Sequence, residues 1–262
     1  MPIRRLVALC CLAFAAGCSH KSSSSGGEGG TPISTSVMHI NAGVAAHDGP
    51  NATVSVTLDD GRLPLATTTY RLTDGDALRA CVLGSCKPLT RVHLNDLLPD
   101  SYTNTFPFVA DVEYSVQLTR TAGTSASSSV TLPPPFDITM PAPGTQFTAG
   151  DVFTVAWWPP GTGPNVDVRA NASCTYTDGE KTLVAAGFTQ GDPDGDGRAD
   201  IGVDDLLKYL DSSSHTSAPV RDCEIQVEVQ HSRIGMIDSV FAGGSIRGSQ
   251  TRSLSLTYVP SR

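Results

Sequence analysis

The sequence is poor in the residues that build long helices and aromatic surfaces. Aromatic residues make up 6% of the chain and charged residues 17%, whereas there are 25 glycines and 18 prolines. Long-chain helix formers are scarce, and serine and threonine are abundant. This composition argues against a helical protein and favours an all-β fold of short strands and many turns.

Motifs of catalysis are also absent from the sequence. There is no phosphate-binding glycine loop and no nucleophile elbow. The histidines after residue 36 stand singly, without metal or triad spacing: His39, His47, His93, His215 and His231. We therefore expect a non-catalytic protein. A triad assembled from distant residues is the alternative that spacing leaves open.

The first 17 residues have the pattern of an export signal. Arg4 and Arg5 precede an apolar segment over residues 6–16, which is too short to span a bilayer as a mature helix. Small residues then come directly before Cys18. The ending Ala-Ala-Gly-Cys resembles the lipobox of bacterial lipoproteins, with Ala15 at the position where that family usually has leucine.

The lipobox resemblance implies a lipid anchor on Cys18. It implies cleavage before Cys18, a diacylglycerol thioether on its sulfur and an acyl group on its new amine. Several acyl chains together hold a protein stably at a membrane. Ser19 is not the aspartate that retains such proteins at the inner membrane, so the outer membrane is expected. An ordinary secreted protein cleaved near this point is the alternative.

The predicted mature chain is acidic. Removal of residues 1–17 takes away Arg4 and Arg5 and no acid, so the formal net charge changes from −8 to −10. A protein of this charge is a poor partner for nucleic acid. The expected partners are the membrane, through the lipid, and another protein of the cell envelope.

Two domains are expected after a flexible tether. The tether is predicted over residues 18–36, which are rich in serine and glycine and have few apolar groups to bury. Short segments in which apolar and polar residues alternate, such as 53–58, recur with turn signals between them and predict a β-sandwich. A run of three prolines predicts a stiff extended link. The expected division is a first domain over 37–132, the link over 133–135 and a second domain over 136–262.

The second half opens with an extended segment, a Pro-Gly turn and a strand that ends in tryptophan. This stretch, over residues 136–158, is similar to the opening of immunoglobulin-like and fibronectin type III-like modules of bacterial surface proteins. The resemblance implies two consecutive immunoglobulin-like β-sandwich domains. Phe153, Val155 and Trp157 are expected to face the core, and Trp158 to face outward. An outward tryptophan can pack at a module junction or stack on a sugar ring.

The last 60 residues or so are expected to hold one helix and two strands. Residues 203–210 carry two acids in a first turn and leucines on one stripe, which predicts a short helix after the acidic loop. Residues 224–230 alternate and predict a strand, and residues 254–258 predict a closing strand. Residues 243–250, between these strands, are rich in glycine and serine and predict a loop.

The acidic loop is the one stretch whose residue types and spacing indicate a definite chemistry. Asp192, Asp194 and Asp196 alternate along the chain, and intervening glycines allow a tight turn. A hard cation bound by oxygen ligands would relieve the repulsion between these acids, with the Arg198 carbonyl and the Asp200 carboxylate as further ligands. Calcium in a structural role is therefore expected. A solvated acidic turn is the alternative.

This loop resembles the D-x-D-x-D-G-x-x-D calcium loops of integrin-type propeller repeats and thrombospondin type 3 repeats. It is more loosely similar to the EF-hand and dockerin loops. Val203 stands at the twelfth position, where the EF-hand has an acid that binds through both oxygens. The resemblance covers about ten residues and therefore indicates a set of ligands rather than a fold.

Four cysteines remain for disulfides in the exported chain. Two of the seven cysteines leave with the signal and Cys18 carries the lipid, so Cys81, Cys86, Cys174 and Cys223 are left. We pair Cys81 with Cys86 and Cys174 with Cys223, because each pair then lies within one expected domain. Zinc is the rival interpretation, but the first pair has no second close pair and no neighbouring histidine.

The function expected from these features is that of a non-catalytic lipoprotein anchored in the outer membrane. Its sandwiches would serve as an envelope structural or protein-interaction module with a structural calcium site. A carbohydrate- or cell-wall-binding surface protein is the alternative, and it requires an exposed row of aromatic side chains.

Overall fold

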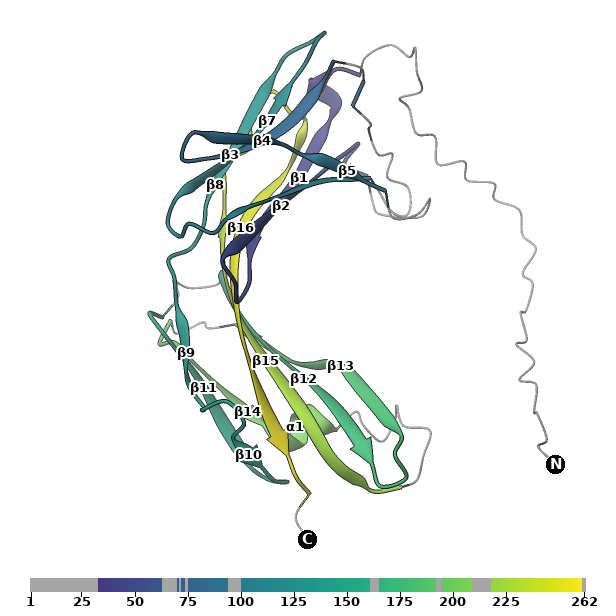
Figure 1. Cartoon of the computed structure of the whole chain (residues 1–262), viewed down its shortest axis with the longest axis vertical. Coiled ribbons are helices and arrows are strands. Elements are labelled where there is room, and N and C mark those ends of the chain that lie inside the picture. The colour runs from purple at the N-terminus through teal and green to yellow at the C-terminus, as the bar shows by residue number, and fades with distance from the viewer. Residues whose placement is uncertain are drawn as a thin grey trace, which may run out of the picture.

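The structure is a computed structural model, and it describes most of the chain after the expected tether. It covers residues 33–62, 70, 72–73, 75–93, 100–160, 165–191, 195–208 and 218–260, with the backbone alone over 181–191. The described chain is almost entirely β, which confirms the predicted fold class (Figure 1). The strands are β1 (His39–Ala46), β2 (Asn51–Asp59), β3 (Ala77–Val82), β4 (Ser85–Pro88), β5 (Thr90–Val92), β6 (Ser101–Pro107), β7 (Glu113–Thr119), β8 (Ala126–Thr131), β9 (Asp137–Met140), β10 (Gln146–Phe147), β11 (Val152–Trp158), β12 (Val166–Tyr176), β13 (Lys181–Gly191), β14 (Arg198–Gly202), β15 (Val220–Ile234) and β16 (Gly243–Tyr258).

Short helical elements accompany these strands in the described chain. A 3-10 turn, η1 (Thr35–Val37), precedes β1, and the α-helix α1 (Val203–Leu207) follows β14. The predicted helix over 203–210 thus begins where expected and ends at Leu207, and residues 209 and 210 lie outside the described residues. Val203 and Leu206 are buried in the second core, so α1 is held by its apolar side.

The first sandwich has the strand order of an immunoglobulin-like domain. One sheet contains β1-β2-β6-β5 and the facing sheet contains β4-β3-β7-β8. In chain order these correspond to the A-B-E-D and C′-C-F-G sheets of that fold. Inward positions alternate along the strands, as in β2, where Val54, Val56 and Leu58 are buried. The expected immunoglobulin-like sandwich is therefore present in this half.

The second sandwich is also built from two sheets. Its smaller sheet has the order β14-β11-β9, and its larger sheet contains β13-β12-β15-β16. Phe153, Val155 and Trp157 of β11 face the core, as predicted, and Trp158 faces outward with 69% of its surface exposed. The second core is a cluster separate from the first.

Strand β16 joins the two sandwiches into one sheet. Its first half, Gly243–Gln250, pairs in parallel with β1 of the first sandwich, and residues 247–258 pair with β15 of the second. The prediction of a loop over residues 243–250 is therefore wrong. The result is a nine-stranded sheet that runs through both sandwiches and lies on the inner side of the arc in Figure 1.

The glycines of residues 243–250 are the reason why this strand was predicted to be a loop. The structure shows why glycine is needed there. Gly244 has a φ of +121°, and a side chain there would collide with the backbone of Ile40 on β1. At Gly248 a Cβ atom would lie 3.1 Å from a methyl group of Val130. Small residues allow β16 to come close to β1 and β8, so a composition typical of loops here serves close strand packing.

The turn between β15 and β16 belongs to the first core rather than to the second. Phe241 and Ile246 are buried in the first core, with exposed fractions of 6% and 0%. The backbone of Met236 exchanges two hydrogen bonds with Ser129 of β8. The first sandwich therefore contains residues from both sides of the predicted link at 133–135.

A buried ion pair fastens the start of the described chain to the far end of the first sandwich. The guanidinium of Arg120, just after β7, lies 2.8 Å from Asp76 Oδ2, and both side chains are almost fully buried. It also donates to the carbonyl of Ile33 at 2.8 Å and to Thr35 Oγ1 at 3.2 Å. The β7–β8 turn lies away from the link at Pro133, so the chain enters the fold at the end opposite the second sandwich (Figure 1).

Ile246→Ala and Leu256→Ala test whether β16 contributes to the cores of both sandwiches. Both side chains are fully buried on the same strand, one in each core, so each truncation should cost about 2–5 kcal/mol. Hydrogen exchange should show the larger loss of protection in β2 and β7 for Ile246→Ala and in β12 for Leu256→Ala. Loss confined to β12 in both variants would contradict the shared strand.

Candidate functional site

The predicted calcium ligands fall partly on residues that the structure describes. Asp192 and Asp194 lie outside the described residues. Asp196 Oδ1 accepts a hydrogen bond from the backbone N–H of Arg198 at 3.1 Å. Asp200, on β14, accepts a hydrogen bond from the hydroxyl of Thr154 at 2.6 Å. Among the described residues there is no group of three or more His, Cys, Asp or Glu side chains placed to hold a metal.

The described part of the acidic loop has the backbone that a tight ligand loop needs. Gly195 and Gly197 have φ values of +67° and +75°, in the left-handed region that favours glycine. The carbonyl of Gly197 accepts from the N–H of Trp157 at 3.0 Å, which fixes the end of the loop beside β11. The donor set fits a hard cation only if the two aspartates outside the described residues join it. Calcium at this loop therefore stays a prediction.

The predicted lipidation site, Cys18, also lies outside the described residues. Within the part of the chain that the structure covers, no helix has the length and apolar character needed to cross a bilayer. The lipid anchor stays a prediction.

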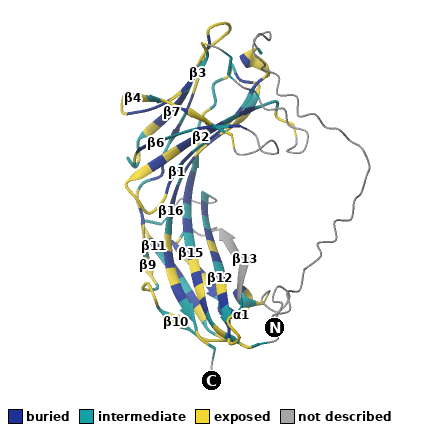
Figure 2. Cartoon of the chain, turned by 45° about the vertical axis from the view of Figure 1, so that its right-hand side comes forward, coloured by how far each residue is buried: buried dark blue, intermediate teal, exposed yellow. Residues whose placement is uncertain are grey.

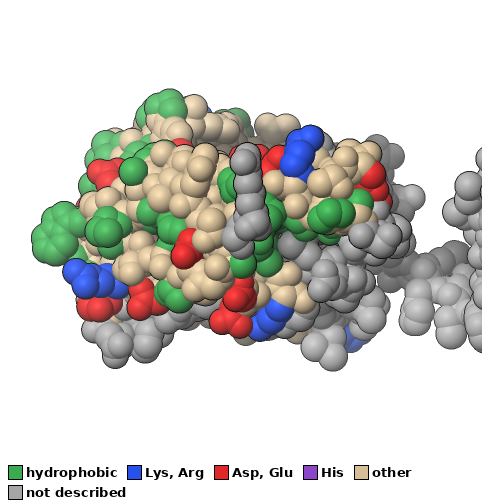
Figure 3. All heavy atoms as spheres, turned by 90° about the horizontal axis from the view of Figure 1, so that it is seen from below, with side chains coloured by type: hydrophobic (Ala, Val, Ile, Leu, Met, Phe, Trp, Pro, Cys, Tyr) green, Lys and Arg blue, Asp and Glu red, His purple; other side chains and the backbone are tan. Residues whose placement is uncertain are grey.

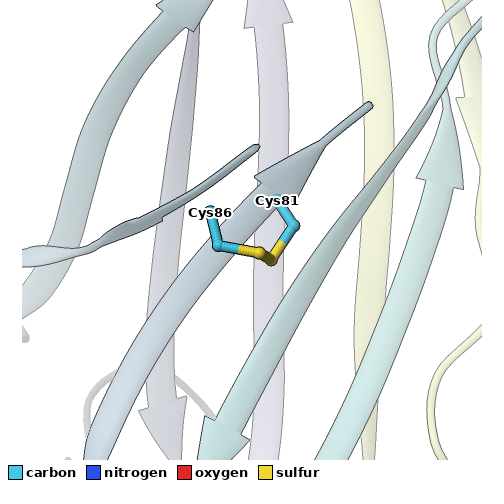
Figure 4. Close-up of a disulfide and its surroundings, with 2 residues drawn as sticks. All are labelled: Cys81 and Cys86. Atoms are coloured by element: carbon cyan, nitrogen blue, oxygen red, sulfur yellow. A yellow bond between two sulfur atoms is a disulfide. The ribbon is translucent and has the colours of Figure 1, made fainter. Parts of the chain in front are cut away.

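Both predicted disulfides are present. Cys81–Cys86 joins β3 to β4 across a two-residue turn (Figure 4), and Cys174–Cys223 joins β12 to β15. In each pair the two cysteines are direct partners in the strand register, with Cα atoms 4.0 Å apart. Both bridges therefore lie within a single sheet, unlike the bridge between sheets that is typical of antibody domains.

One histidine pairs with a carboxylate in the described part of the chain. His93 Nδ1 lies 2.8 Å from Asp100 Oδ1, and Arg91 binds the other oxygen at 2.8 and 2.9 Å. Asp100 is only 4% exposed, so this network holds β5 against β6 with a buried carboxylate. His215 lies outside the described residues.

A polar groove lies where the two sandwiches meet on the nine-stranded sheet. It has a volume of about 390 Å³ and is formed by the β1–β2 turn and by the solvent-facing side of β15 and β16. Figure 2 shows exposed and buried residues alternating along these strands. Its lining residues are Ala45, His47, Asp48, Gly49, Pro50, Asn51, Thr53, Gln226, Glu228, Thr251 and Ser253.

The groove side chains form rows across neighbouring strands. Gln226 lies between Asn171 of β12 and Ser255 of β16, and Glu228 lies between Arg169 and Ser253. These are the outward positions of strands whose alternate residues are buried. The floor is therefore the surface of a hydrogen-bonded sheet and carries amide, hydroxyl and carboxylate groups, which are suited to hydrogen bonding with a polar partner.

The β1–β2 turn is fixed to β16 by a carboxylate. Asp48 Oδ2 accepts from the backbone N–H of Ser253 at 3.0 Å and from the hydroxyl of the same residue. Arg252 Nη1 donates to the carbonyl of His47 at 3.5 Å, and its Nε lies 3.9 Å from Asp48 Oδ1 and from Asp137 Oδ1. One wall of the groove thus comes from the first sandwich, and its position depends on contacts with the second.

Sequence reasoning did not find this groove. The only sign of the groove in the sequence is the alternation over residues 224–230, which indicates which side chains face outward. What it could not indicate is the turn that faces them, because Asp48 and Ser253 are 205 positions apart. The groove exists only because β16 pairs with β1.

Exposed apolar side chains elsewhere are scattered. Trp158 is the one aromatic residue among the large apolar residues that are strongly exposed in the described chain. Figure 3, which looks at the far end of the second sandwich, shows hydrophobic side chains in several separate places among polar ones. The described residues therefore present no row of aromatic rings on which a sugar chain could stack.

Comparison with known proteins adds little to the fold. No protein-family model matches the chain, and no curated protein matches it in sequence. Among solved structures, it is similar to the first two immunoglobulin domains of DIP-gamma (8% identity, TM-score 0.23, 86% of this chain and 95% of that chain). It is similar to fibronectin(III)-like modules of CbhA from Clostridium thermocellum (12%, 0.23, 86% and 94%) and to the ectodomain of mouse nectin-like molecule 4 (10%, 0.25, 87% and 66%). TM-scores this low do not establish a common fold. The immunoglobulin-like assignment depends on the strand order described above.

Thermal and urea unfolding in EDTA and in calcium test the predicted metal loop. Calcium bound only by the folded state should raise the free energy of unfolding by about 1.4 kcal/mol when its concentration is ten times the dissociation constant. The double variant Asp194→Ala, Asp196→Ala should lose this increment, whereas Asp205→Ala, an exposed acid of α1, should keep it. Equal curves for the wild type with and without calcium would show that the loop is a solvated turn.

Proposed function

We propose that the chain is a non-catalytic lipoprotein anchored through Cys18 in the bacterial outer membrane, where it serves as a two-module interaction arm. The observation that carries this proposal is the groove, which both sandwiches build together on one continuous sheet. Ligand sites occur preferentially at such domain interfaces. The calcium of the acidic loop would have a structural role.

The direction of the arm supports this proposal. The described chain begins at the far end of the first sandwich, where Arg120 holds Ile33 and Thr35. A tether from Cys18 would therefore join the fold at the end away from the groove and the second sandwich. The rigid sheet would keep the groove at a fixed angle, which reduces the entropy lost on binding.

The partner we propose is another protein of the cell envelope. Asn51, Thr53, Gln226 and Glu228 offer both donors and acceptors, and the lining contains no Phe, Tyr or Trp. The rims of non-obligate protein interfaces are polar in this way. A carbohydrate or cell-wall ligand is the second candidate, favoured only by the exposed Trp158 at the end of β11.

Site-specific photocrosslinking in the native cell tests the proposal. A photoreactive amino acid at Gln226, in the groove, should give a discrete protein adduct. The same substitution at Gln117, on the outward face of the opposite sheet of the first sandwich, is the control and should give none. Cys18→Ala should move the protein out of the membrane fraction and remove the adduct.

The result that would contradict the interaction arm is equal labelling at Gln226 and Gln117. An adduct at Gln226 that is digested by a muramidase rather than by a protease would favour the cell-wall alternative. Retention of Cys18→Ala in the membrane fraction would contradict the lipid anchor separately from the groove.

A further inference from the structure

A histidine is buried at the junction between the two sandwiches. His231, near the end of β15, is 4% exposed. Its ring stacks on Phe136, the first residue after the proline link, with centroids 3.8 Å apart and an interplanar angle of 9°. The edge of Trp157 lies at a centroid distance of 6.4 Å. His231 thus packs against Trp157 near the end of β11 and against the residue that follows the link, where the sandwiches are joined.

The polar atoms around this ring are not fully satisfied. Within the described residues, His231 Nε2 has no hydrogen-bond partner, and neither does Oε1 of Gln250, its direct partner in the β15–β16 register. The ring also lines a small cavity of about 60 Å³, together with Pro133, Pro134, Pro159, Pro160, Asn165, Val166, Ser232 and Arg233. Such a cavity has room for water.

The charged groups at this junction oppose a second positive charge. On β16, Arg252 lies over the Phe136 ring at 5.6 Å, and Arg247 reaches the hydroxyl of Ser232 at 3.5 Å. On β15, Arg233 lines the same cavity, although it is paired with Asp111 at 3.0 Å. The acid at the start of β9, Asp137, is 3.9 Å from the Arg252 guanidinium rather than bound to the histidine. Burial, and then the charge of Arg252, lower the pKa of His231 from 6.5 to about 4.

We propose that His231 makes the junction between the sandwiches acid-sensitive: protonation places a buried positive charge near Arg252, and the cost of this charge loosens the bend that forms the groove. Thr251 and Ser253 of the groove flank Arg252 on β16, and His231 packs on the other face of the same two strands. A chain exported from the cell meets the pH of its surroundings, so this device would couple that pH to the shape of the groove. The inference does not depend on the identity of the partner.

The direction in which pH changes the free energy of unfolding follows from proton linkage. The native pKa of His231 is depressed, so between pH 6.5 and about pH 4 the unfolded chain binds more protons than the folded chain. The stabilising contribution of the neutral ring is therefore complete above pH 6.5 and is lost as the pH falls toward 4. At pH 5.0 the equilibrium constant for unfolding should be about 30-fold higher than at pH 7.5 from this residue alone, which corresponds to about 2 kcal/mol.

Urea unfolding at pH 7.5 and pH 5.0 tests the proposal with two matched variants. His231→Phe keeps an aromatic ring against Phe136 and removes the protonation site, so it should lose the pH-dependent 30-fold difference. His47→Gln removes an exposed histidine on the turn beside the same junction and should keep that difference. Parallel pH dependence in the wild type and His231→Phe would overturn the proposal.

Two measurements on the wild type keep the test independent of whether His231→Phe folds. A ¹³C titration of the His231 ring should give a pKa below about 5, and a value near 6.5 would overturn the proposal. Hydrogen exchange, corrected for the intrinsic effect of pH, should show lower protection at residues 229–234 and 249–254 at pH 5.0, with β7 unchanged. An equal loss of protection in β7 would also overturn it, because the acid effect would then not be located at the junction.

Discussion

The pairing of β16 with β1 and β15 is the interaction on which the rest of the molecule depends. Residues 247–250 have hydrogen-bonded neighbours on both sides, one strand from each sandwich. Two immunoglobulin-like modules joined only by a proline link would be expected to move relative to one another. Here the backbone ladder continues through the junction, so a change of angle requires hydrogen bonds to break or the sheet to bend. The arc in Figure 1 follows from this continuous sheet.

Several features share this origin. The groove needs the β1–β2 turn to lie against Ser253, and the Asp48 contacts hold it there. His231 pairs with Val166 at the start of β12, and it is buried because it lies at an inward position at the end of β15 that meets the first sandwich. The Arg120 network holds the start of the described chain at the opposite end of the first sandwich. Scaffold, groove and acid-sensitive residue are thus consequences of one long strand pair.

Much of the fold could be predicted because its signals are local. Alternation placed Val54, Phe153 and Ile225 inward, and pairing cysteines within each expected domain found both bridges. The double role of β16 could not be predicted in this way. Its glycines resemble a loop in composition, and their purpose is a close approach to Ile40, about 200 positions away. The groove and the junction could not be predicted for the same reason, because both depend on the pairing of β16 with β1. The calcium and lipid sites rest on motifs whose key residues, Asp192, Asp194 and Cys18, lie outside the described residues.

The measurement that tests the account most directly is the distribution of distances between spin labels on the two sandwiches. Labels at Ser127 on β8 and Ser173 on β12 occupy exposed positions, one on each sandwich. A continuous β16 predicts one narrow distribution, and insertion of two glycines between Gln250 and Thr251 should broaden it. A broad distribution in the wild type, unchanged by that insertion, would contradict the account, because the sandwiches would then be connected by the proline link alone.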